Sequence, residues 1–326
     1  MLNYQGWEDT IECLESLQKV DYHEFTTIVV DNGSSNDSLG KIQEWASGNR
    51  AVESDIIRYN PHSKPLYTLH YTRQTAESGG NNDLERELLS HFPQNRLVLI
   101  DTGENLGFSG GNNVGARYAV KQGYDHIVLL NNDTVVVDKD FLIKMVRAFD
   151  IDQSCKVVGP KIIDLANGFD GPYIYESYIG ELFLLTIKNQ FRKIFGCIPV
   201  YIDMHAITSA HPVPVYKISG ACMTFDAEFL HEIDYLDENV WLSCEEAIVA
   251  EKVLTKDKKI FFQPLTVLIH KKARSPRPKN SRIAILRNHF KQRQYFLKTY
   301  RRYGKLKMAP IRAIHATRLL FEVLKN

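Results

Sequence analysis

The segment HIVLLNNDTVV, residues 126–136, decides how this chain folds. Its first five residues form a short apolar run, which is typical of a strand buried on both faces. The polar cluster Asn131-Asn132-Asp133 follows where that strand ends. The same arrangement occurs earlier, where FTTIVV at 25–30 runs into the polar turn 31–35. A third apolar run, 97–100, precedes the glycine-rich stretch 105–113, so the pattern repeats along the chain.

Helical patterns lie between these strands. Apolar residues recur at helical spacing in 9–17, a second helix is predicted over about 36–46, and a third leads from the glycine-rich loop through Gln122. Strands that alternate with helices predict an α/β fold with a Rossmann-like, mainly parallel sheet flanked by helices. Ligands of such sheets bind at the carboxyl ends of the strands, and the polar turns are predicted to lie there.

Length and composition set the broad class. The chain has 326 residues, of which 44 % are hydrophobic, enough to bury a full core. No apolar run is long enough to span a membrane, and no signal peptide opens the chain, so we expect a cytoplasmic protein. Five scattered cysteines without a C-x-x-C pair make a disulfide framework or a structural zinc site improbable.

Two segments interrupt the strand–helix rhythm. Residues 51–95 are polar, and we interpret them as an insertion with at most a helix near 83–91. Residues 165–215 are irregular and rich in Gly, Tyr and Pro, which is typical of a loop over a site. At the start of the chain, 1–4 lead straight into a turn, so the first strand is expected to be truncated.

Charge divides the chain into an acidic body and a basic tail. Residues 271–326 hold 17 Lys and Arg and one acid, Glu322, whereas the whole chain has a net charge of only +1. We place the body at 1–275 and the tail at 276–326, with helices over about 280–302 and 310–324. An amphipathic cationic tail suits an anionic membrane surface. It would equally suit packing on the acidic body, and without a nucleic-acid motif we expect no nucleic acid.

Several polar residues are candidates for chemistry. Asp133 at a strand end suits a hard divalent cation, although a turn that caps the strand would use the same residue. Asp31 could accept hydrogen bonds from a nucleoside or simply organise its turn. Glu245 and Glu246 stand at the mouth of a helix, where a carboxylate pair can leave one member as a base. The helix dipole favours acids there as well. His270 ends an apolar run and is either a metal ligand or structural.

Taken in order, these pieces resemble a family 2 glycosyltransferase of the GT-A fold, and most of all the rhamnosyltransferase-like enzymes that build bacterial O-antigen, capsule or cell-wall polysaccharide. The resemblance rests on motifs distributed over about 1–275: VVDNGSSNDS (29–38), ENLGFSGGNNVGARYA (104–119), LLNNDTVV (129–136), ISGACMTF (218–225) and YLDENVWLSCEE (235–246).

The resemblance implies roles for individual residues. Asp133 matches the metal-binding Asp of a D-x-D-like motif, and His270 matches a His that completes the metal shell, with Mg²⁺ or Mn²⁺ as the cofactor. Glu246 matches the general base, and Glu245 is its neighbour. The implied donor-binding and acceptor-binding residues are Tyr4, Asp31, Asn105, Gly107, Asn113, Asn131, Ser219 and Gly220.

The implied reaction is an inverting transfer of a sugar from a nucleoside diphosphate, such as dTDP-rhamnose or a UDP-sugar, to a hydroxyl of a glycan or a polyprenyl-diphosphate-linked acceptor. The enzyme would work in the cytoplasm, at the inner face of the cell membrane. Two alternatives remain at this point. One is a sugar-nucleotide-processing nucleotidyltransferase, although its arginine-rich phosphate loop is missing after the first strand. The other is a non-catalytic GT-A-like scaffold or binding protein.

Overall fold

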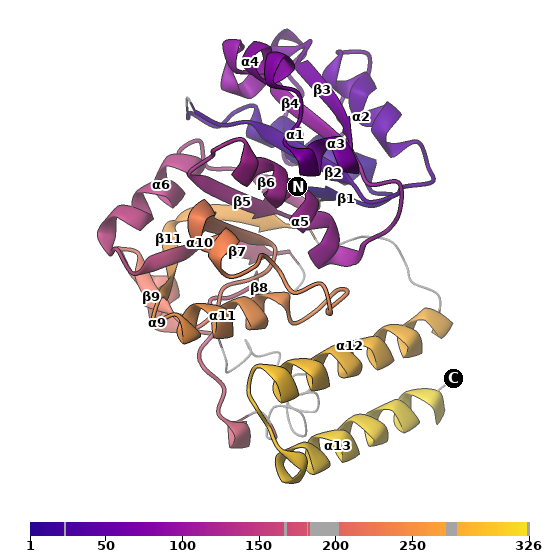
Figure 1. Cartoon of the computed structure of the whole chain (residues 1–326), viewed down its shortest axis with the longest axis vertical. Helices are drawn as coiled ribbons and strands as arrows, with labels where there is room; N and C mark the ends of the chain where they lie inside the picture. The colour runs from indigo at the N-terminus through magenta and orange to yellow at the C-terminus, as the bar shows by residue number, and fades with distance from the viewer. Residues whose placement is uncertain (23, 166–167, 181, 183–201, 272–278, 325–326) are drawn as a thin grey trace.

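The computed structural model describes residues 1–22, 24–165, 168–180, 182, 202–271 and 279–324. Two adjoining β-sheets with helices around them form the body of the molecule (Figure 1). A pair of long helices lies below the second sheet in that view. The predicted α/β fold class is therefore confirmed at the level of layers and element order.

The first sheet is entirely parallel, in the order β1-β2-β4-β3. Its strands are β1 (Leu2–Asn3), β2 (Thr27–Asp31), β3 (Tyr67–Thr72) and β4 (Arg96–Asp101). The two central strands are buried on both faces, as their unbroken β-branched and leucine runs predict. Because all four strands run the same way, the turn after Asp31 lies at the carboxyl edge of the sheet.

The second sheet is mixed, in the order β5-β10-β7-β11-β6, with β8 and β9 paired to its flanks. Its strands are β5 (His126–Leu130), β6 (Thr134–Val136), β7 (Cys155–Asp164), β8 (Gly168–Phe169), β9 (Val213–Val215), β10 (Cys222–Asp226) and β11 (Lys259–His270). Only β7 and β11 run parallel in it, and the other pairs are antiparallel. The parallel character that the sequence predicts thus belongs chiefly to the first half of the chain.

The two sheets meet at β1. Leu2 forms a parallel bridge with Asn131, the residue that follows β5. Asn131 in turn donates its backbone N–H to the carbonyl of Ala221, just before β10. Because of this junction, the turn after Asp31 and the turn around Asp133 lie at the same edge of the combined sheet.

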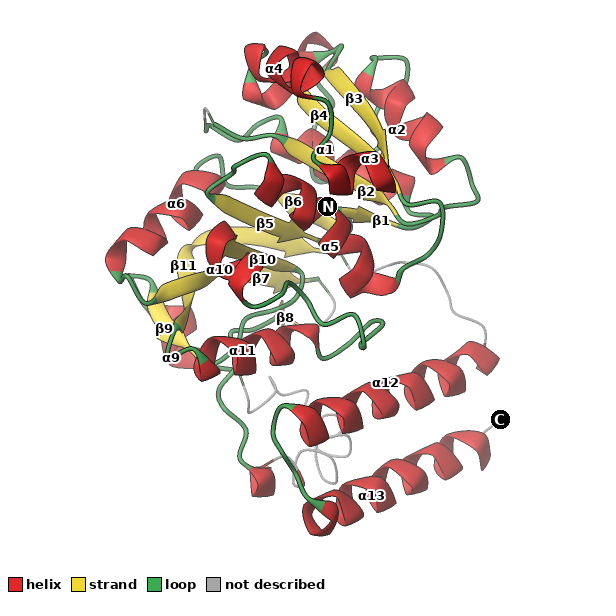
Figure 2. Cartoon of the chain, in the orientation of Figure 1, coloured by secondary structure: helices red, strands yellow, loops and turns green. Residues whose placement is uncertain are grey.

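Helices cover both sheets (Figure 2). In the body they are α1 (Trp7–Leu17), α2 (Ser38–Ala46), α3 (Arg73–Ser78), α4 (Asn82–Ser90), α5 (Gly107–Lys121), α6 (Phe141–Arg147), α9 (Met204–Thr208), α10 (Ala227–Glu232) and α11 (Glu245–Thr255). Helix α5 lies close to β1 and β2 because of its glycines. A Cβ at Gly111 would stand 2.4 Å from Leu2, and one at Gly115 would stand 2.9 Å from Val30.

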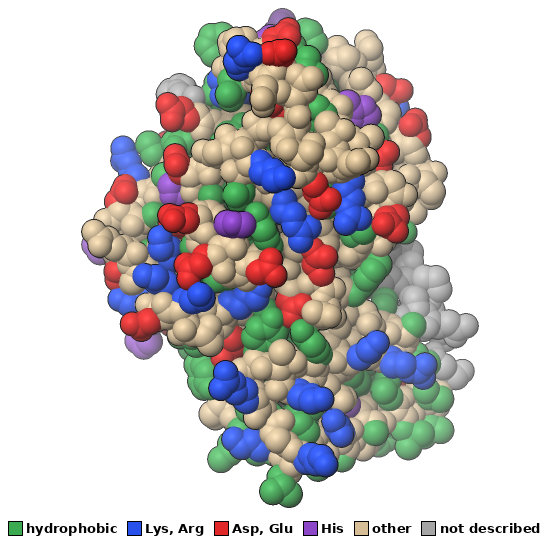
Figure 3. All heavy atoms as spheres, viewed as in Figure 1, with side chains coloured by type: hydrophobic (Ala, Val, Ile, Leu, Met, Phe, Trp, Pro, Cys, Tyr) green, Lys and Arg blue, Asp and Glu red, His purple; other side chains and the backbone are tan. Residues whose placement is uncertain are grey.

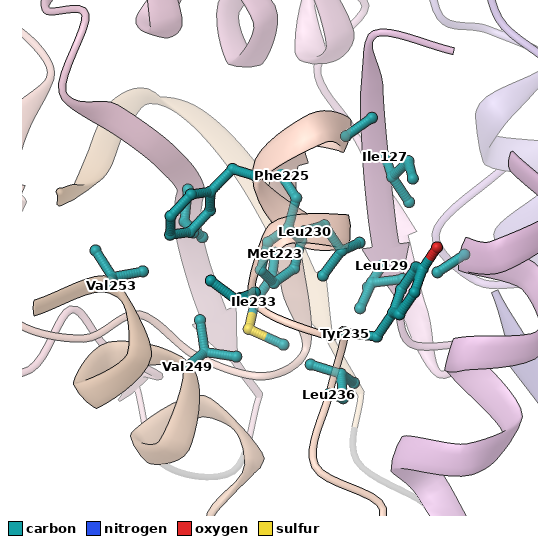
Figure 4. Packing of buried hydrophobic residues seen from close by; sticks show 14 of the residues in the cluster. Ile127, Leu129, Met223, Phe225, Leu230, Ile233, Tyr235, Leu236, Val249 and Val253 are labelled. Atoms are coloured by element: carbon teal, nitrogen blue, oxygen red, sulfur yellow. The ribbon is translucent and has the colours of Figure 1, made fainter. Parts of the chain in front are cut away.

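The largest described core cluster joins β5 and β10 to helices α10 and α11 (Figure 4). Phe225 and Leu230 are fully buried in it, and Val249 of α11 faces them. This packing fixes α11 against the sheet, and the position of its first turn follows.

The segment 51–95 differs from its expectation. Instead of at most one helix, it contributes β3, α3 and α4, and β3 pairs with β4 over six residues. Buried and exposed residues alternate at the carboxyl end of β3, as in an edge strand that is covered on one face. Because the exposed positions are polar, the sequence of this strand resembles that of a loop. The glycine-rich stretch 105–113, expected as a loop, is mostly helical, because α5 begins at Gly107.

The tail forms α12 (Lys279–Thr299) and α13 (Lys305–Leu324), close to the expected helices. The boundary predicted at 275/276 falls in 272–278, outside the described residues. Phe296 and Leu297 share a buried cluster with Ile248 of α11. Lys and Arg side chains are spread over this part of the surface (Figure 3). The tail therefore packs on the body while much of its charge faces solvent.

Polar contacts also fasten the tail to the loop before α11. Asp237 accepts hydrogen bonds from the hydroxyls of Tyr295 and Tyr300, at 2.8 and 2.7 Å. The Oε1 of the buried Gln292 accepts from the backbone N–H of Leu242 and the hydroxyl of Ser243, both at 3.1 Å. Among the described residues, no helix is long and apolar enough to cross a bilayer.

Candidate active site

Asp133 and His270 meet because β6 pairs with β11. Asp133 occupies the turn between β5 and β6, and His270 is the last residue of β11, in register with Thr134. The His270 Nε2 lies 3.3 Å from Asp133 Oδ1. Burial alone would lower the pKa of His270, but the two carboxylates at its ring nitrogens raise it to about 9. Burial would raise the pKa of Asp133, but the hydrogen bond and charge of His270, together with a backbone hydrogen bond and the charge of Lys271, lower that pKa overall.

Asp170 completes this group and was missed by the sequence analysis. Its Oδ2 lies 3.3 Å from the other ring nitrogen of His270, Nδ1, and accepts a hydrogen bond of 3.0 Å from Ser219. Its Oδ1 accepts a bond of 2.5 Å from the hydroxyl of Tyr173. Asp170 lies in the irregular 165–215 segment, of which 166–167, 181 and 183–201 are outside the described residues. No motif or periodicity there marks it out.

The pair of Asp133 and His270 has the chemistry to hold a hard divalent cation. It offers one carboxylate and one imidazole nitrogen, and Asp170 at Nδ1 supplies the outer carboxylate that commonly orients a metal-binding His. Within the described ranges, no set of three or more His, Cys, Asp and Glu side chains is already arranged around a metal position. Mg²⁺ and Mn²⁺ often keep waters and bind phosphate oxygens, so two protein ligands fit them.

Glu245 and Glu246 are the first two residues of α11. They follow Cys244, whose φ of 70° turns the chain into the helix. The Glu246 Oε1 lies 3.4 Å from the Lys217 Nζ. The Glu245 Oε2 is buried and has no hydrogen-bond partner among the described residues, and burial, with the charge of Glu246, raises the pKa of Glu245 to about 8. The Glu245 carboxyl is therefore mainly neutral near pH 7, and Glu246 is the member of the pair that contacts Lys217.

A chain of contacts connects Glu246 to the pair of Asp133 and His270. Lys217, which pairs with Glu246, lies 4.4 Å from the ring centroid of Tyr173, and the two residues pair through their backbones. Tyr173 in turn donates to Asp170, which faces His270. The sequence-predicted metal and base residues therefore belong to one continuous polar network.

Ser219 and Gly220 lie where these groups converge. Ser219 donates to Asp170. A Cβ at Gly220 would be 3.7 Å from Glu245 Oε1 and 3.9 Å from Glu246 Oε2, in ordinary contact with both carboxylates. The structure therefore brings together five of the predicted site residues, Asp133, Ser219, Gly220, Glu246 and His270, with Glu245 beside them.

The residues predicted for the nucleotide have internal partners as well. Asp31 is 2 % exposed and accepts hydrogen bonds from Asn3 and Ser34, so it organises its own turn. Tyr4 is 49 % exposed and available to a ligand. Asn131 is the junction residue between the sheets. Their predicted contacts with the donor stay predictions.

Asn105, Gly107 and Asn113 hold the start of α5. Asn105 Oδ1 accepts from the backbone N–H of Gly107 at 2.9 Å. Gly107 has a φ of 73°, and a Cβ there would stand 2.9 Å from the ring of Trp241. Asn113 is 1 % exposed and exchanges hydrogen bonds with the backbone of Leu236. The contacts of Gly107 and Asn113 help to position the 236–244 loop, and the predicted role of all three residues at the donor stays untested.

Comparisons with known proteins bear on the fold and on the class of protein. No family model matches the chain. Low-salt glycan biosynthesis hexosyltransferase Agl10 of Haloferax volcanii is 27 % identical over 168 residues, which is 51 % of this chain and 49 % of that protein. An uncharacterised protein of Mycobacterium tuberculosis is 41 % identical over 63 residues, 17 % of this chain and 24 % of that protein. The matched part thus spans about half of the hexosyltransferase and less of the second relative.

Solved structures share the fold. The mannosyltransferase PcManGT from Pyrobaculum calidifontis, in complex with GDP-Man and Mn²⁺, superimposes with a TM-score of 0.52 at 15 % identity, over 97 % of this chain and 67 % of that one. GalNAc-T7 with UDP, GalNAc and Mn²⁺ gives 0.50 at 14 % identity, over 87 % and 46 % of the two chains. S. aureus TarS gives 0.50 at 13 % identity, over 92 % and 39 %. The chain has the fold of the GT-A glycosyltransferases.

Proposed function

We propose that this protein is an inverting, metal-dependent glycosyltransferase. It would move a sugar from a nucleoside diphosphate to a hydroxyl group of a glycan or of a lipid-linked oligosaccharide in cell-surface polysaccharide synthesis. The observation that carries this proposal is the polar network that joins His270 and Asp133 to Glu246 through Asp170, Tyr173 and Lys217, on a GT-A fold.

In a single displacement, the two ends of this network would have different roles. Asp133 and His270 would hold a divalent metal, which would supply positive charge to offset that of the departing diphosphate. Glu246 takes the proton of the acceptor hydroxyl as that oxygen bonds to the anomeric carbon. The bond to the nucleoside diphosphate breaks, and its electron pair leaves with the phosphate oxygen. One displacement without a covalent enzyme intermediate inverts the anomeric centre. Glu245, neutral and buried, is less suited to accept that proton.

For the donor we propose a nucleoside-diphosphate sugar, with dTDP-rhamnose or a UDP-sugar as the first candidates. The neighbouring structures carry GDP-Man and UDP, which supports the class of donor and leaves the base open. Tyr4 and the turn after Asp31 lie at the same sheet edge as Asp133, so they are the proposed contacts for the nucleoside.

Calorimetric titration with UDP, dTDP and GDP, each with and without Mn²⁺ or Mg²⁺, tests the proposal. Metal-dependent binding of one nucleotide is expected, and Asp133→Ala should abolish the metal dependence. Asp140→Ala is the matched control, because Asp140 is an exposed carboxylate of the same strand–turn–helix region. A screen for nucleoside-diphosphate release from the matching sugars follows. Binding of none of the three by the folded protein would favour the non-catalytic scaffold instead.

We further propose that the 276–326 tail brings the enzyme to an anionic membrane surface at the inner face of the cell membrane, where a polyprenyl-diphosphate-linked acceptor would lie. The support is the excess of Lys and Arg in the tail, together with the exposed apolar side chains Leu320, Phe321 and Leu324 on α13.

Flotation with vesicles tests this. Binding to phosphatidylglycerol-containing vesicles and none to pure phosphatidylcholine vesicles is expected, with loss of binding in the double variant Leu320→Ser/Phe321→Ser. Phe92→Ser is the control, because Phe92 is 79 % exposed and belongs to the body, between α4 and β4, and not to the tail. Equal flotation of the parent, the double variant and the control would contradict membrane binding through the tail.

A further inference from the structure

Arg301 belongs to the basic tail, yet its side chain is only 8 % exposed. The residue follows α12, and its guanidinium lies over the ring of Tyr175, with Cζ 4.1 Å from the ring centroid. The same group lies 5.4 Å from the ring centroid of Tyr216. These two rings meet edge to face, with their centroids 5.1 Å apart. A cation over aromatic faces is attracted to the ring quadrupoles, and more strongly where water is excluded. Two tyrosines of the body therefore hold this guanidinium.

Polar contacts of the guanidinium reach three separate segments of the body. Nη2 donates a hydrogen bond of 2.7 Å to the hydroxyl of Tyr216, and Nη1 donates one of 3.3 Å to the backbone carbonyl of Glu176. Nε lies 2.7 Å from the Oε1 of Glu251, which also accepts a hydrogen bond of 2.7 Å from the Tyr216 hydroxyl. The planar guanidinium of an arginine can make these contacts at once because its donors point in fixed directions, whereas a lysine offers a single point charge.

Two of these contacts bear on Glu246. Tyr216 directly precedes Lys217, whose Nζ lies 3.4 Å from the Glu246 Oε1. Glu251 belongs to α11, the helix whose second residue is Glu246. Arg301 therefore joins the segment that carries Lys217 to the helix that carries Glu246, and this connection limits the movement of one relative to the other.

The remaining contacts bear on Asp170. Tyr175 lies shortly after Tyr173 in the chain, and the Tyr173 hydroxyl donates a hydrogen bond of 2.5 Å to Asp170. Tyr173 and Lys217 also exchange backbone hydrogen bonds, one of 2.7 Å from the Tyr173 N–H and one of 3.3 Å from the Lys217 N–H. Arg301 thus contacts residues beside both members of this backbone pair.

We propose that Arg301 is a positioning residue of the active site, which holds the backbone pair of Tyr173 and Lys217 in place from the tail. Through this pair it sets where the Lys217 ammonium meets Glu246 and where the Tyr173 hydroxyl meets Asp170. The consequence for turnover rests on the proposed function, whereas the placement of the pair can be measured without any reaction. If Arg301 only docked the tail, its replacement would lower stability and leave both the pair and the turnover unchanged.

Hydrogen exchange tests the placement of the pair. Arg301→Lys keeps the charge of the tail and loses the planar group, so the N–H groups of Tyr173 and Lys217 should exchange at least about 5-fold faster than in the parent. Exchange in the central strand β4 should not change, which separates a local effect from a loss of global stability. Arg302→Lys is the matched control, because Arg302 is the exposed neighbour, and it should exchange as the parent does. Unchanged exchange at Tyr173 and Lys217 in Arg301→Lys would overturn the proposal.

Turnover gives the second readout, measured as nucleoside-diphosphate release from dTDP-rhamnose or from the UDP-sugar that the parent uses. Arg301→Lys should lower kcat by at least about 10-fold and leave the KM for the donor unchanged, because only the geometry around Glu246 is altered. Combined with Lys217→Met, it should lose less than the product of the two single losses, since both changes act on the same contact. An unchanged kcat, or losses that simply multiply, would contradict a role through Lys217. If the parent turns over none of these donors, the proposed function fails, and the exchange rates still decide whether Arg301 places the pair.

Discussion

The Oδ2 of Asp170 lies 3.3 Å from the Nδ1 of His270, on the side of the ring opposite to Asp133. This arrangement fixes the ring with Nε2 toward Asp133 and favours a proton on Nδ1. Asp170 therefore orients the His270 ring through Nδ1 and would not itself contact a metal ion at Nε2. Asp170 is a positioning residue whose effect can be measured as metal affinity.

Asp170→Asn should weaken Mn²⁺ binding by about 10- to 100-fold, because the amide no longer stabilises a proton on Nδ1. Titration calorimetry of the protein with MnCl₂ in the presence of the nucleotide that binds is the measurement. Asp140→Asn, an exposed carboxylate, should bind as the parent does. An unchanged affinity of Asp170→Asn for Mn²⁺ would show that metal binding does not depend on the contact between Asp170 and His270.

Glu246→Gln should lower kcat by at least about 100-fold while leaving the affinity for the nucleoside diphosphate unchanged, because only proton transfer is lost. Glu245→Gln is the matched variant, one residue away on the same helix turn, and should retain most of kcat because Glu245 is already neutral. Initial rates with saturating donor separate the two. The reverse order of the two variants would assign the base to Glu245.

Glu245 should make stability depend on pH. Its pKa is raised in the folded state, so the fold binds this proton more tightly than the unfolded chain does. Its contribution is therefore complete below its usual pKa of about 4.5 and is lost as the pH rises toward 8. Glu245→Gln lacks this loss. The difference in Tm between the variant and the parent should grow in favour of the variant from pH 5 to pH 8.5, and a constant difference would speak against the buried acid.

Gly107→Ala should cost more stability than Gly123→Ala. Both glycines have positive φ, 73° and 78°, so alanine is strained at each by about 1 kcal/mol. Only at Gly107 would the new Cβ also strike the ring of Trp241, whereas nothing lies within 4 Å at Gly123. Thermal unfolding of both variants gives the difference, and activity should fall in Gly107→Ala alone. Equal losses of Tm would mean that the contact with Trp241 relaxes freely.

Sequence reasoning predicted the elements with strong local patterns. The apolar runs at β2, β4 and β5 and the helical spacing of α1 gave their positions to within a few residues. The polar turns after β2 and β5 followed from the parallel topology, which places them at one sheet edge. His270 and Asp133, far apart in the chain, were paired by resemblance, and the register of β6 with β11 explains why they meet.

Other features had no local signal. Two of the three partners of Asp170, Ser219 and His270, are distant in sequence, so its own segment does not distinguish it. The edge strand β3 is only half covered, and its alternating residues resemble a polar loop. The different environments of Glu245 and Glu246 depend on how deeply each carboxylate is buried, which adjacent identical residues cannot reveal.

The contact of Gln292 with the backbone of Leu242 and the hydroxyl of Ser243 has a thermodynamic consequence. The loop that leads to Glu245 and Glu246 and the helix α12 of the basic tail share these bonds, so their conformational equilibria are coupled. A partner that bound the tail and shifted α12 would change the affinity of this loop for a ligand in contact with it by some factor. By linkage, that ligand changes the affinity of the tail for its partner by the same factor.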